Sequence, residues 1–220
     1  MKCESVMRWM VPVMVLGLCV CALPAAAHDY WLYAGSEPIM PGGETVLRVG
    51  GGHGFPRDEG GPRPSLIRRV ALQGPDGAWT ELEPADDGTY PVRFERAGWY
   101  RSLMILQPPR APRPVYFAQS LFSVDAPPGT WPASLGEGVE IVVRRKDETS
   151  DVFRVLRDGA PVHARLLLQG AGAGTSTVHA PVEEGAPLSM SRDQPVLVST
   201  TVGPQGASLY IHFGQHHDRE

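Results

Sequence analysis

Histidine is the residue type in this sequence that is best suited to bind a metal ion. The chain has seven histidines and three cysteines, and all three cysteines lie within the first 21 residues. His28 follows three consecutive alanines, so cleavage after Ala27 would leave His28 with a free α-amine. The amine and the imidazole Nδ1 could then chelate one metal ion, because an α-amine loses its proton readily at neutral pH. The sequence therefore predicts a nitrogen donor set at His28, and chance cleavage before a histidine is the alternative.

A second candidate ligand, His53, lies in the glycine-rich segment VGGGHGFPRDE at residues 49–59. Glycines give the backbone the freedom to bring such a histidine close to a ligand. Asp58 and Glu59 follow closely, and either carboxylate could bind the metal or orient an imidazole by accepting its hydrogen bond. Asp29, which follows His28, could likewise bind the metal or orient an imidazole. An ordinary loop histidine beside solvated acidic residues is the alternative.

A third nitrogen ligand from His53 would complete a square-planar or tetragonal site, which suits Cu(II) or Ni(II). The remaining histidines are weaker candidates. His212 alternates with Leu209, Ile211 and Phe213 in a predicted strand, so it faces away from that apolar side. The other four are interpreted as solvated or strand residues: His163, His179, His216 and His217.

Motifs for common enzymatic chemistry are missing from the sequence. There is no G-x-S-x-G elbow, no P-loop and no H-E-x-x-H segment. No carboxylate pair is marked for glycoside hydrolysis either. The full chain has a formal net charge of −4, and the loss of Lys2, Arg8 and Glu4 with a leader makes it −5, which argues against nucleic acid as a partner. The sequence thus favours a binding protein over an enzyme.

The first 27 residues have the pattern of a cleaved secretory signal. Lys2 and Arg8 precede an apolar run from Met10 to Leu23, and small residues stand before the expected cleavage site. The apolar run is shorter than the roughly 20 residues that a spanning helix needs. We therefore expect export to the periplasm and a mature chain of residues 28–220 without cysteine. An uncleaved anchor and lipidation of a cysteine in the run are the alternatives.

The rest of the chain predicts an all-β protein. Gly (25 residues) and Pro (22 residues) are spread throughout, and short apolar runs alternate with turn signals. Predicted strands lie near 30–33, 44–50, 65–73, 79–83, 89–95, 98–106, 115–124, 138–144, 151–157, 161–169, 176–179, 194–202 and 207–213. Asp158-Gly159 and Asp87-Gly88 each predict a tight hairpin turn, and Ala97-Gly98-Trp99-Tyr100 is common in immunoglobulin-like sandwiches. Each domain is accordingly expected to be an immunoglobulin-like or transthyretin-like β-sandwich.

A segment rich in proline and glycine, DAPPGTWPASLGE, separates two groups of predicted strands. It divides the chain into an N-terminal β-sandwich at residues 28–126, which carries the metal site, and a C-terminal β-sandwich at residues 137–215. Residues 216–220 form a tail. One larger, continuous sandwich is the alternative.

Two motifs at the start of the expected mature chain resemble a known family. The segment HDYWL at residues 28–32 and the later PGGETVLRVGGGHGFPRDE are similar to exported bacterial proteins labelled the periplasmic component of a cobalt or nickel ABC-type transport system, relatives of NikM-like nickel-uptake proteins. FRVLRDGAPVHARLLLQG at residues 153–170 looks like that family's second sandwich, whereas residues 190–200 depart from its pattern. The resemblance implies a nickel or cobalt ligand and a membrane uptake transporter as partner.

The leading hypothesis is a periplasmic protein that binds a divalent transition metal, nickel or cobalt before copper, through His28 and His53 with Asp29 nearby. One alternative is a copper protein or copper-dependent oxidative enzyme that uses the N-terminal histidine. Another is a non-catalytic binding or adhesion module whose contacts are Trp31, Trp79, Trp99 and Tyr100. Those aromatic side chains are more simply interpreted as sandwich core.

Overall fold

The computed structural model describes residues 28–35, 39–126, 134–147, 150–170, 174–188 and 194–212, and over these residues the protein is all-β. The predicted signal at residues 1–27 and the tail at residues 216–220 lie outside the described part. Within it, the helical content is a single 3-10 turn, Pro64–Leu66. The strands are β1 (Asp29–Tyr33), β2 (Gly43–Gly52), β3 (Ile67–Gln73), β4 (Trp79–Glu81), β5 (Tyr90–Phe94), β6 (Gly98–Leu106), β7 (Tyr116–Val124), β8 (Val139–Arg145), β9 (Asp151–Arg157), β10 (Ala160–Val162), β11 (Ala164–Gly170), β12 (Gly174–Ala180), β13 (Ala186–Leu188), β14 (Val196–Val202) and β15 (Gln205–His212).

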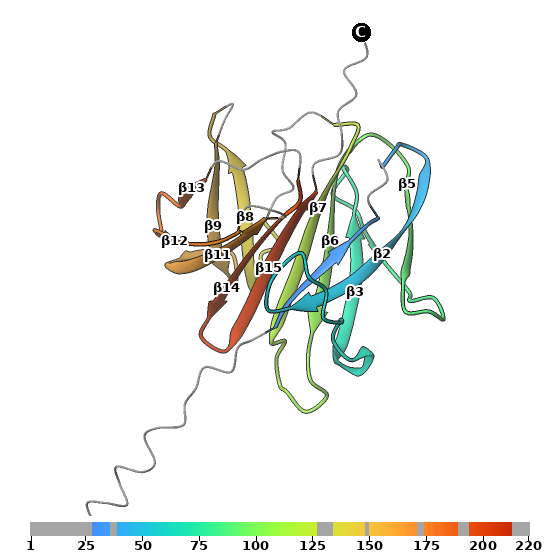
Figure 1. Cartoon of the computed structure of the whole chain (residues 1–220), viewed down its shortest axis with the longest axis horizontal. Helices are drawn as coiled ribbons and strands as arrows, with labels where there is room; N and C mark the ends of the chain where they lie inside the picture. The colour runs from blue at the N-terminus through green and yellow to red at the C-terminus, as the bar shows by residue number, and fades with distance from the viewer. Residues whose placement is uncertain are drawn as a thin grey trace, which may run out of the picture.

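The strands form one large sheet and two small ones (Figure 1). The large sheet has eight strands in the order β12-β11-β14-β15-β7-β6-β3-β4. One small sheet has the order β1-β2-β5, and the other has the order β10-β9-β13 with β8 also paired to β9. The described strand pairs are antiparallel except β7 with β15, which run parallel at the middle of the large sheet. The predicted all-β, sandwich-like fold is therefore confirmed.

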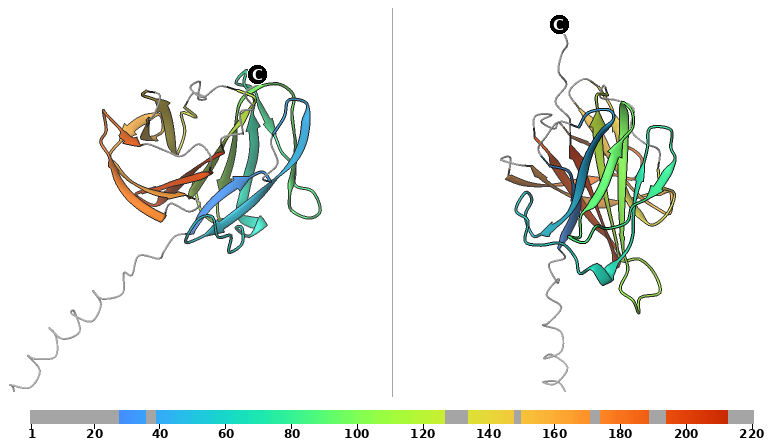
Figure 2. Two further views of the ribbon diagram at one scale, coloured as in Figure 1. Left: turned by 45° about the horizontal axis from the view of Figure 1, so that its top comes forward. Right: turned by 90° about the vertical axis from the view of Figure 1, so that its right-hand side faces the viewer.

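The two faces of the large sheet pack against different small sheets. Successive residues of a strand point to opposite faces, and β6 shows the result clearly. Tyr100 and Met104 enter a core with β1, β2 and β5, whereas Trp99 and Leu103 enter a second core with β8 and β9. In Figures 1 and 2 the blue β1 and β2 and the olive-coloured β8 and β9 accordingly lie on different sides of β7 and β15.

The predicted boundary near residue 130 does not divide the large sheet. β7 from the first half and β15 from the second are neighbours, with Gly206 opposite Tyr116 and His212 opposite Phe122. Leu197 and Tyr210 from the second half also pack into the first core. The halves therefore share one sheet, and the division into two domains stays a prediction.

Two turn predictions have different outcomes. Asp158 and Gly159 have φ values of 51° and 78° and join β9 to β10 in a tight hairpin, as predicted. Asp87-Gly88 also forms a turn, since the Gly88 amide donates to the Ala85 carbonyl oxygen at 2.9 Å. However, β4 pairs with β3 while β5 pairs with β2, so this turn connects two sheets and is not a hairpin. The hairpin interpretation was wrong because a turn motif specifies local backbone geometry but not the partner of the next strand.

Candidate metal site

Strand register brings the two predicted histidine ligands together. β1 and β2 pair antiparallel with Asp29 opposite Gly52. His28 directly precedes β1 and His53 directly follows β2, so the same register continued by one residue places them opposite each other. Residues directly opposite in an antiparallel pair project to the same face. Their imidazole ring centroids lie 4.0 Å apart with a tilt of 54° between the ring planes.

The glycines that end β2 allow the following loop and the rings of β1 to pack against the strand. A Cβ atom at Gly50 would lie 2.5 Å from Nε1 of the Trp31 indole. A Cβ atom at Gly51 would lie 2.7 Å from the Gly60 carbonyl oxygen, because the loop folds back across the strand. The glycine tract is therefore required by close contact, which fixes where His53 leaves the sheet.

The loop of residues 53–60 is anchored mainly by Asp58. One carboxylate oxygen, Oδ1, accepts the backbone N–H of Gly51 at 3.2 Å and of Gly60 at 2.8 Å, while Oδ2 accepts the hydroxyl of Tyr33 at 3.3 Å. The Glu59 N–H donates to the Gly51 carbonyl oxygen at 2.7 Å. Asp58 is thus used in holding the loop, which leaves Glu59 as the acidic side chain that turns toward the histidines.

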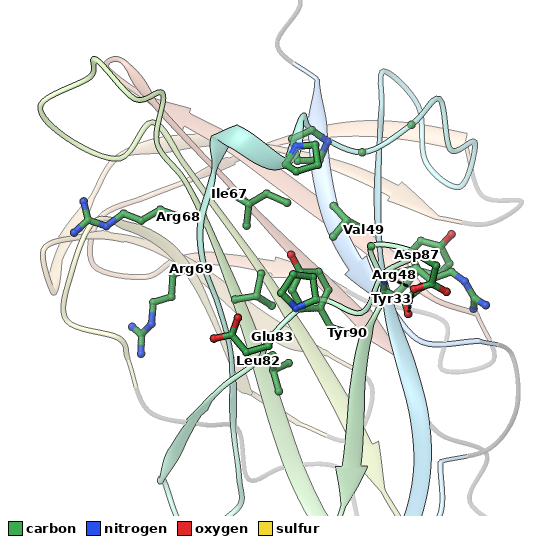
Figure 3. Close-up of a pocket in the computed structure, with 18 of the residues that line it drawn as sticks. Tyr33, Arg48, Val49, Ile67, Arg68, Arg69, Leu82, Glu83, Asp87 and Tyr90 are labelled. Carbon is green, nitrogen blue, oxygen red and sulfur yellow. Dashed lines mark hydrogen bonds between the residues drawn. The ribbon is translucent and has the colours of Figure 1, made fainter.

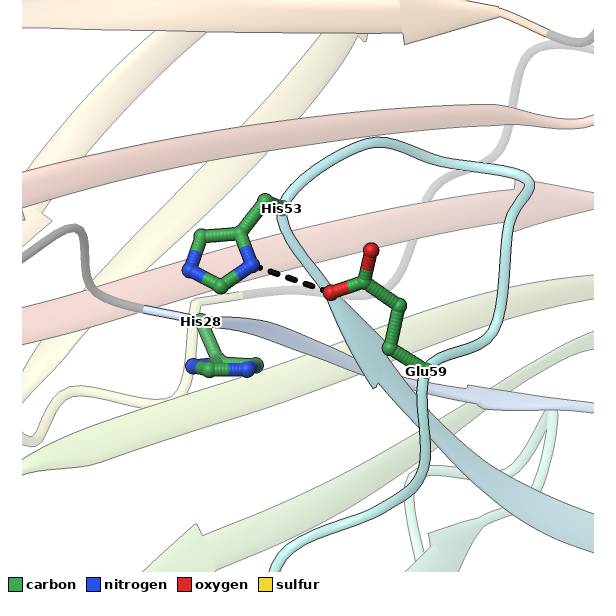
Figure 4. A group of neighbouring side chains, drawn as sticks. All are labelled: His28, His53 and Glu59. Atoms are coloured by element: carbon green, nitrogen blue, oxygen red, sulfur yellow. Dashed lines mark hydrogen bonds and ion pairs between the residues drawn. The ribbon is translucent and has the colours of Figure 1, made fainter.

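His28, His53 and Glu59 form a compact group at the surface (Figure 4). One potential ligand atom from each residue lies within 4.8 Å of the other two. Nδ1 of His53 is 3.0 Å from Oε2 of Glu59, and these two side chains are 46% and 33% exposed. The hydrogen bond with His53 lowers the pKa of Glu59 below its ordinary value, so the carboxylate is charged at neutral pH.

This arrangement suits a divalent transition metal in one of two ways. Two imidazole nitrogens and a carboxylate oxygen could all bind the ion directly, leaving other coordination positions open. Alternatively, Nδ1–H of His53 donates to Glu59 and its Nε2 binds the ion, the common pattern in which a carboxylate orients a histidine ligand. Both arrangements use His28 and His53, and they differ only in the role of Glu59.

Asp29, the third residue predicted at the site, points away from the group into the sheet. Its Oδ1 accepts the Tyr116 hydroxyl at 3.2 Å, and its Oδ2 accepts Ser199 Oγ and Gln169 Nε2, both at 3.0 Å. Burial raises the pKa of Asp29, although these hydrogen bonds act in the opposite direction. Asp29 is therefore a half-buried link behind the site, and Glu59 provides the carboxylate beside the imidazoles.

Within the described residues, the other histidines are not part of this group. His212 ends β15, where its Nδ1 lies 3.4 Å from the Tyr210 hydroxyl, and burial lowers its pKa. His163 and His179 are exposed, with ring centroids 6.0 Å apart. His216 and His217 lie outside the residues that the structure describes.

Three of the four aromatic residues considered as partner contacts are buried. Trp31, Trp99 and Tyr100 are 2%, 6% and 4% exposed, which confirms their interpretation as core. The Tyr100 hydroxyl also donates to the Arg96 carbonyl oxygen at 3.1 Å, a bond typical of a tyrosine corner in β-sandwiches. Trp79 is partly exposed, and the guanidinium groups of Arg69 and Arg101 each lie 5.6 Å from its ring.

A groove of about 780 Å³ lies beside the same loop, between β2 and β5 on one side and β3 and β4 on the other (Figure 3). Its floor is apolar, with Val49, Ile67, Leu82 and Tyr90. Charged side chains surround this floor: Arg48, Arg68, Arg69, Asp58, Glu81, Glu83 and Asp87. A groove with both characters can accept an organic ligand that has an apolar body and polar ends.

Comparison with known proteins does not assign this chain to a family. No protein-family model matches the chain, and no curated protein sequence is similar to it. Among solved structures, a segment of two fibronectin type-III domains from chicken tenascin is 14% identical, with 81% of this chain and 94% of that chain covered and a TM-score of 0.29. The BSP domain of a biofilm-associated protein is 9% identical over 84% of this chain and 30% of that chain, with a TM-score of 0.24. At such scores these likenesses carry no functional inference.

The structure shows residues behind the site that the sequence did not indicate. Gln169, Ser199 and Tyr116 bind Asp29 from positions 87 to 170 residues away along the chain. No local motif marks them, because polar residues inside apolar strands show their role only once the sheet order is known.

No helix among the described residues is long and apolar enough to cross a membrane.

Proposed function

We propose that this chain is an exported protein that binds a divalent transition metal through His28 and His53, with Glu59 as ligand or orienting carboxylate. The observation that carries the proposal is the convergence of these three side chains, whose potential ligand atoms lie within 4.8 Å of one another. Histidines 25 residues apart meet because β1 and β2 pair in the one register that places them opposite. The site is open to solvent, which suits uptake and release of an ion.

Nickel is the metal on which two independent lines agree. Imidazole nitrogens with an α-amine favour Ni(II) or Cu(II), and the resemblance of residues 28–59 to exported nickel and cobalt proteins implies Ni(II) or Co(II). If the mature chain begins at His28, its amine adds a donor directly at the site. The same resemblance supports the periplasm as the place of action and a membrane uptake transporter as the recipient of the ion.

Isothermal titration with Ni(II), Co(II) and Cu(II) tests this proposal on protein that begins at His28. We expect one ion per chain, and we expect His28→Ala and His53→Ala each to weaken binding by about tenfold or more, since each removes a ligand. His179→Ala is the matched control, because it removes an exposed histidine outside the group. Equal affinity in all four proteins would contradict the proposal.

The contribution of the amine can be tested separately. A chain extended by two residues before His28 moves the amine away from the imidazole while all side chains remain. Weaker Ni(II) and Cu(II) binding in the extended protein would support chelation by the amine. Unchanged binding would assign the site to side chains alone.

A second candidate function is the binding of an organic ligand in the groove beside the loop. The observation that favours it is the groove itself, whose volume of about 780 Å³ is within the range of small-molecule sites. Screening a library of small organic acids and amines by ligand-observed NMR would test it, with Leu82→Arg as the variant that obstructs the apolar floor. Hits that persist in Leu82→Arg would remove this candidate.

A further inference from the structure

We infer that Gln169, from the second half of the chain, is a positioning residue for the metal site. Its side-chain amide joins the strand that starts after His28 to the loop that starts at His53. The inference rests on the proposed function for its effect on metal binding. Its structural part, the joining of the two segments, stands on geometry alone.

The contacts of Gln169 reach both segments that carry the histidines. Oε1 accepts the backbone N–H of Phe55 at 2.5 Å, two residues after His53. Nε2 donates to Oδ2 of Asp29 at 3.0 Å, one residue after His28. Gln169 is 1% exposed, so its own side-chain amide is shielded from water.

A primary amide is the group that these two partners require. The Phe55 N–H needs an acceptor and the Asp29 carboxylate needs a donor, and the end of a glutamine side chain presents one of each. A glutamate would place a second carboxylate against Asp29, and a methionine would satisfy neither partner. Because buried polar groups without partners are costly, the amide is held in one orientation and holds the two segments in turn.

The pairing of β1 with β2 places the two histidines opposite each other, but no strand pairing in the described structure joins β1 or the loop of His53 to the large sheet. β1 pairs with β2 alone, whereas Gln169 lies on β11 of the large sheet. β1 is held against that sheet by side chains: Ser120 Oγ donates to the Leu32 carbonyl oxygen at 2.6 Å, and the Ser208 hydroxyl donates to that of Tyr30. Gln169 alone among these contacts also reaches the loop of His53. All three potential ligands lie in residues 28–59, but their positions therefore also depend on a residue from the second half of the chain.

The test compares Gln169→Met with Gln119→Met in the full mature protein. Both changes replace a buried glutamine of the large sheet by an apolar side chain of similar length, and Gln119 is also 1% exposed but has no contact with the site. Three quantities are measured: Ni(II) and Cu(II) affinity by calorimetry, the Cu(II) EPR spectrum, and hydrogen exchange of the Phe55 amide in metal-free protein. Thermal unfolding confirms that both variants fold.

In Gln169→Met we expect affinity to fall by about tenfold or more, as for loss of other residues that orient metal ligands. We also expect a changed EPR spectrum and faster exchange at Phe55, while Gln119→Met matches the wild type in all three. Unchanged affinity in Gln169→Met, or a loss of affinity without faster exchange at Phe55, would overturn the inference. If the wild type binds no metal, the proposed function fails, and Phe55 exchange alone decides whether Gln169 joins the two segments.

Discussion

The contact between His53 and Glu59 bears on which imidazole nitrogen is available to a metal ion. Where Glu59 acts as the orienting carboxylate, its Oε2 accepts Nδ1–H of His53 at 3.0 Å, and Nε2 is the nitrogen left to bind the ion. A carboxylate in this position also makes the imidazole a better donor. In that arrangement the tautomer of His53 is set by a residue six positions later in the same loop.

Glu59→Gln tests this contact. The amide can still accept a hydrogen bond from Nδ1 but lacks the negative charge, so we expect Ni(II) affinity to fall by about tenfold. Glu83→Gln is the control, since it removes an exposed carboxylate that is not in the histidine group. Calorimetry at one pH and ionic strength measures both, and equal affinities would show that the charge of Glu59 has no part in binding.

His212 gives a prediction for the pH dependence of stability. Burial lowers its pKa in the folded protein below the 6.5 that it has when exposed. The unfolded chain therefore binds a proton more readily, and the contribution of neutral His212 is complete above about pH 6.5 and is lost as the pH falls below it. In EDTA, the unfolding midpoint of His212→Gln should fall less than that of the wild type between pH 7.5 and pH 5. Parallel curves would contradict this.

For the individual residues of the site, the sequence predicted the ligand types but only part of their arrangement. His53 and Glu59 could be proposed together because they share one short segment. Asp29 was placed at the metal because it adjoins His28, yet alternation along β1 turns its carboxylate into the sheet. The residues that bind it, Tyr116, Gln169 and Ser199, are 87 to 170 positions away and have no local signal.

Among the elements, the end of β2 has a strict steric requirement. Gly50→Ala would place a methyl group 2.5 Å from the Trp31 indole, and the indole is 2% exposed with little room to move. We expect a loss of about 1–3 kcal/mol in the free energy of unfolding, the usual cost of overpacking. Gly54→Ala is the matched control, because nothing lies within 4 Å of its added Cβ atom. Urea denaturation compares the two, and equal losses would refute the steric explanation.

Most strands could be predicted because their periodicity and turn residues are local. The predicted strands at 98–106 and 151–157 coincide with β6 and β9. β13 (Ala186–Leu188) was missed because three residues are too few to show a period, and the predicted strand at 161–169 is interrupted at His163 between β10 and β11. Strand partners, in contrast, depend on contacts between residues far apart in the chain, which is why the predicted hairpin at Asp87-Gly88 was wrong.

For the whole molecule, the shared sheet predicts that both cores unfold together. Phe122 belongs to the first core and Phe153 to the second, and both are fully buried. Phe122→Ala and Phe153→Ala should each cost about 3–5 kcal/mol and lower one common transition. Hydrogen exchange measured by mass spectrometry across a urea series reports each half separately. Two transitions, each shifted by only one of the variants, would instead favour two independent domains.

The position of β15 has a consequence for the order in which the molecule can assemble. This strand is the last in the described chain, yet it lies between β14 and β7 in the large sheet. A ribosome makes the amino end first, so β7 and β14 each have one edge of unpaired backbone groups until Gln205 and the residues after it are made. A chain cut before Gln205 would keep two open edges, each a template for pairing with another molecule. Such truncated chains should therefore collect in insoluble aggregates.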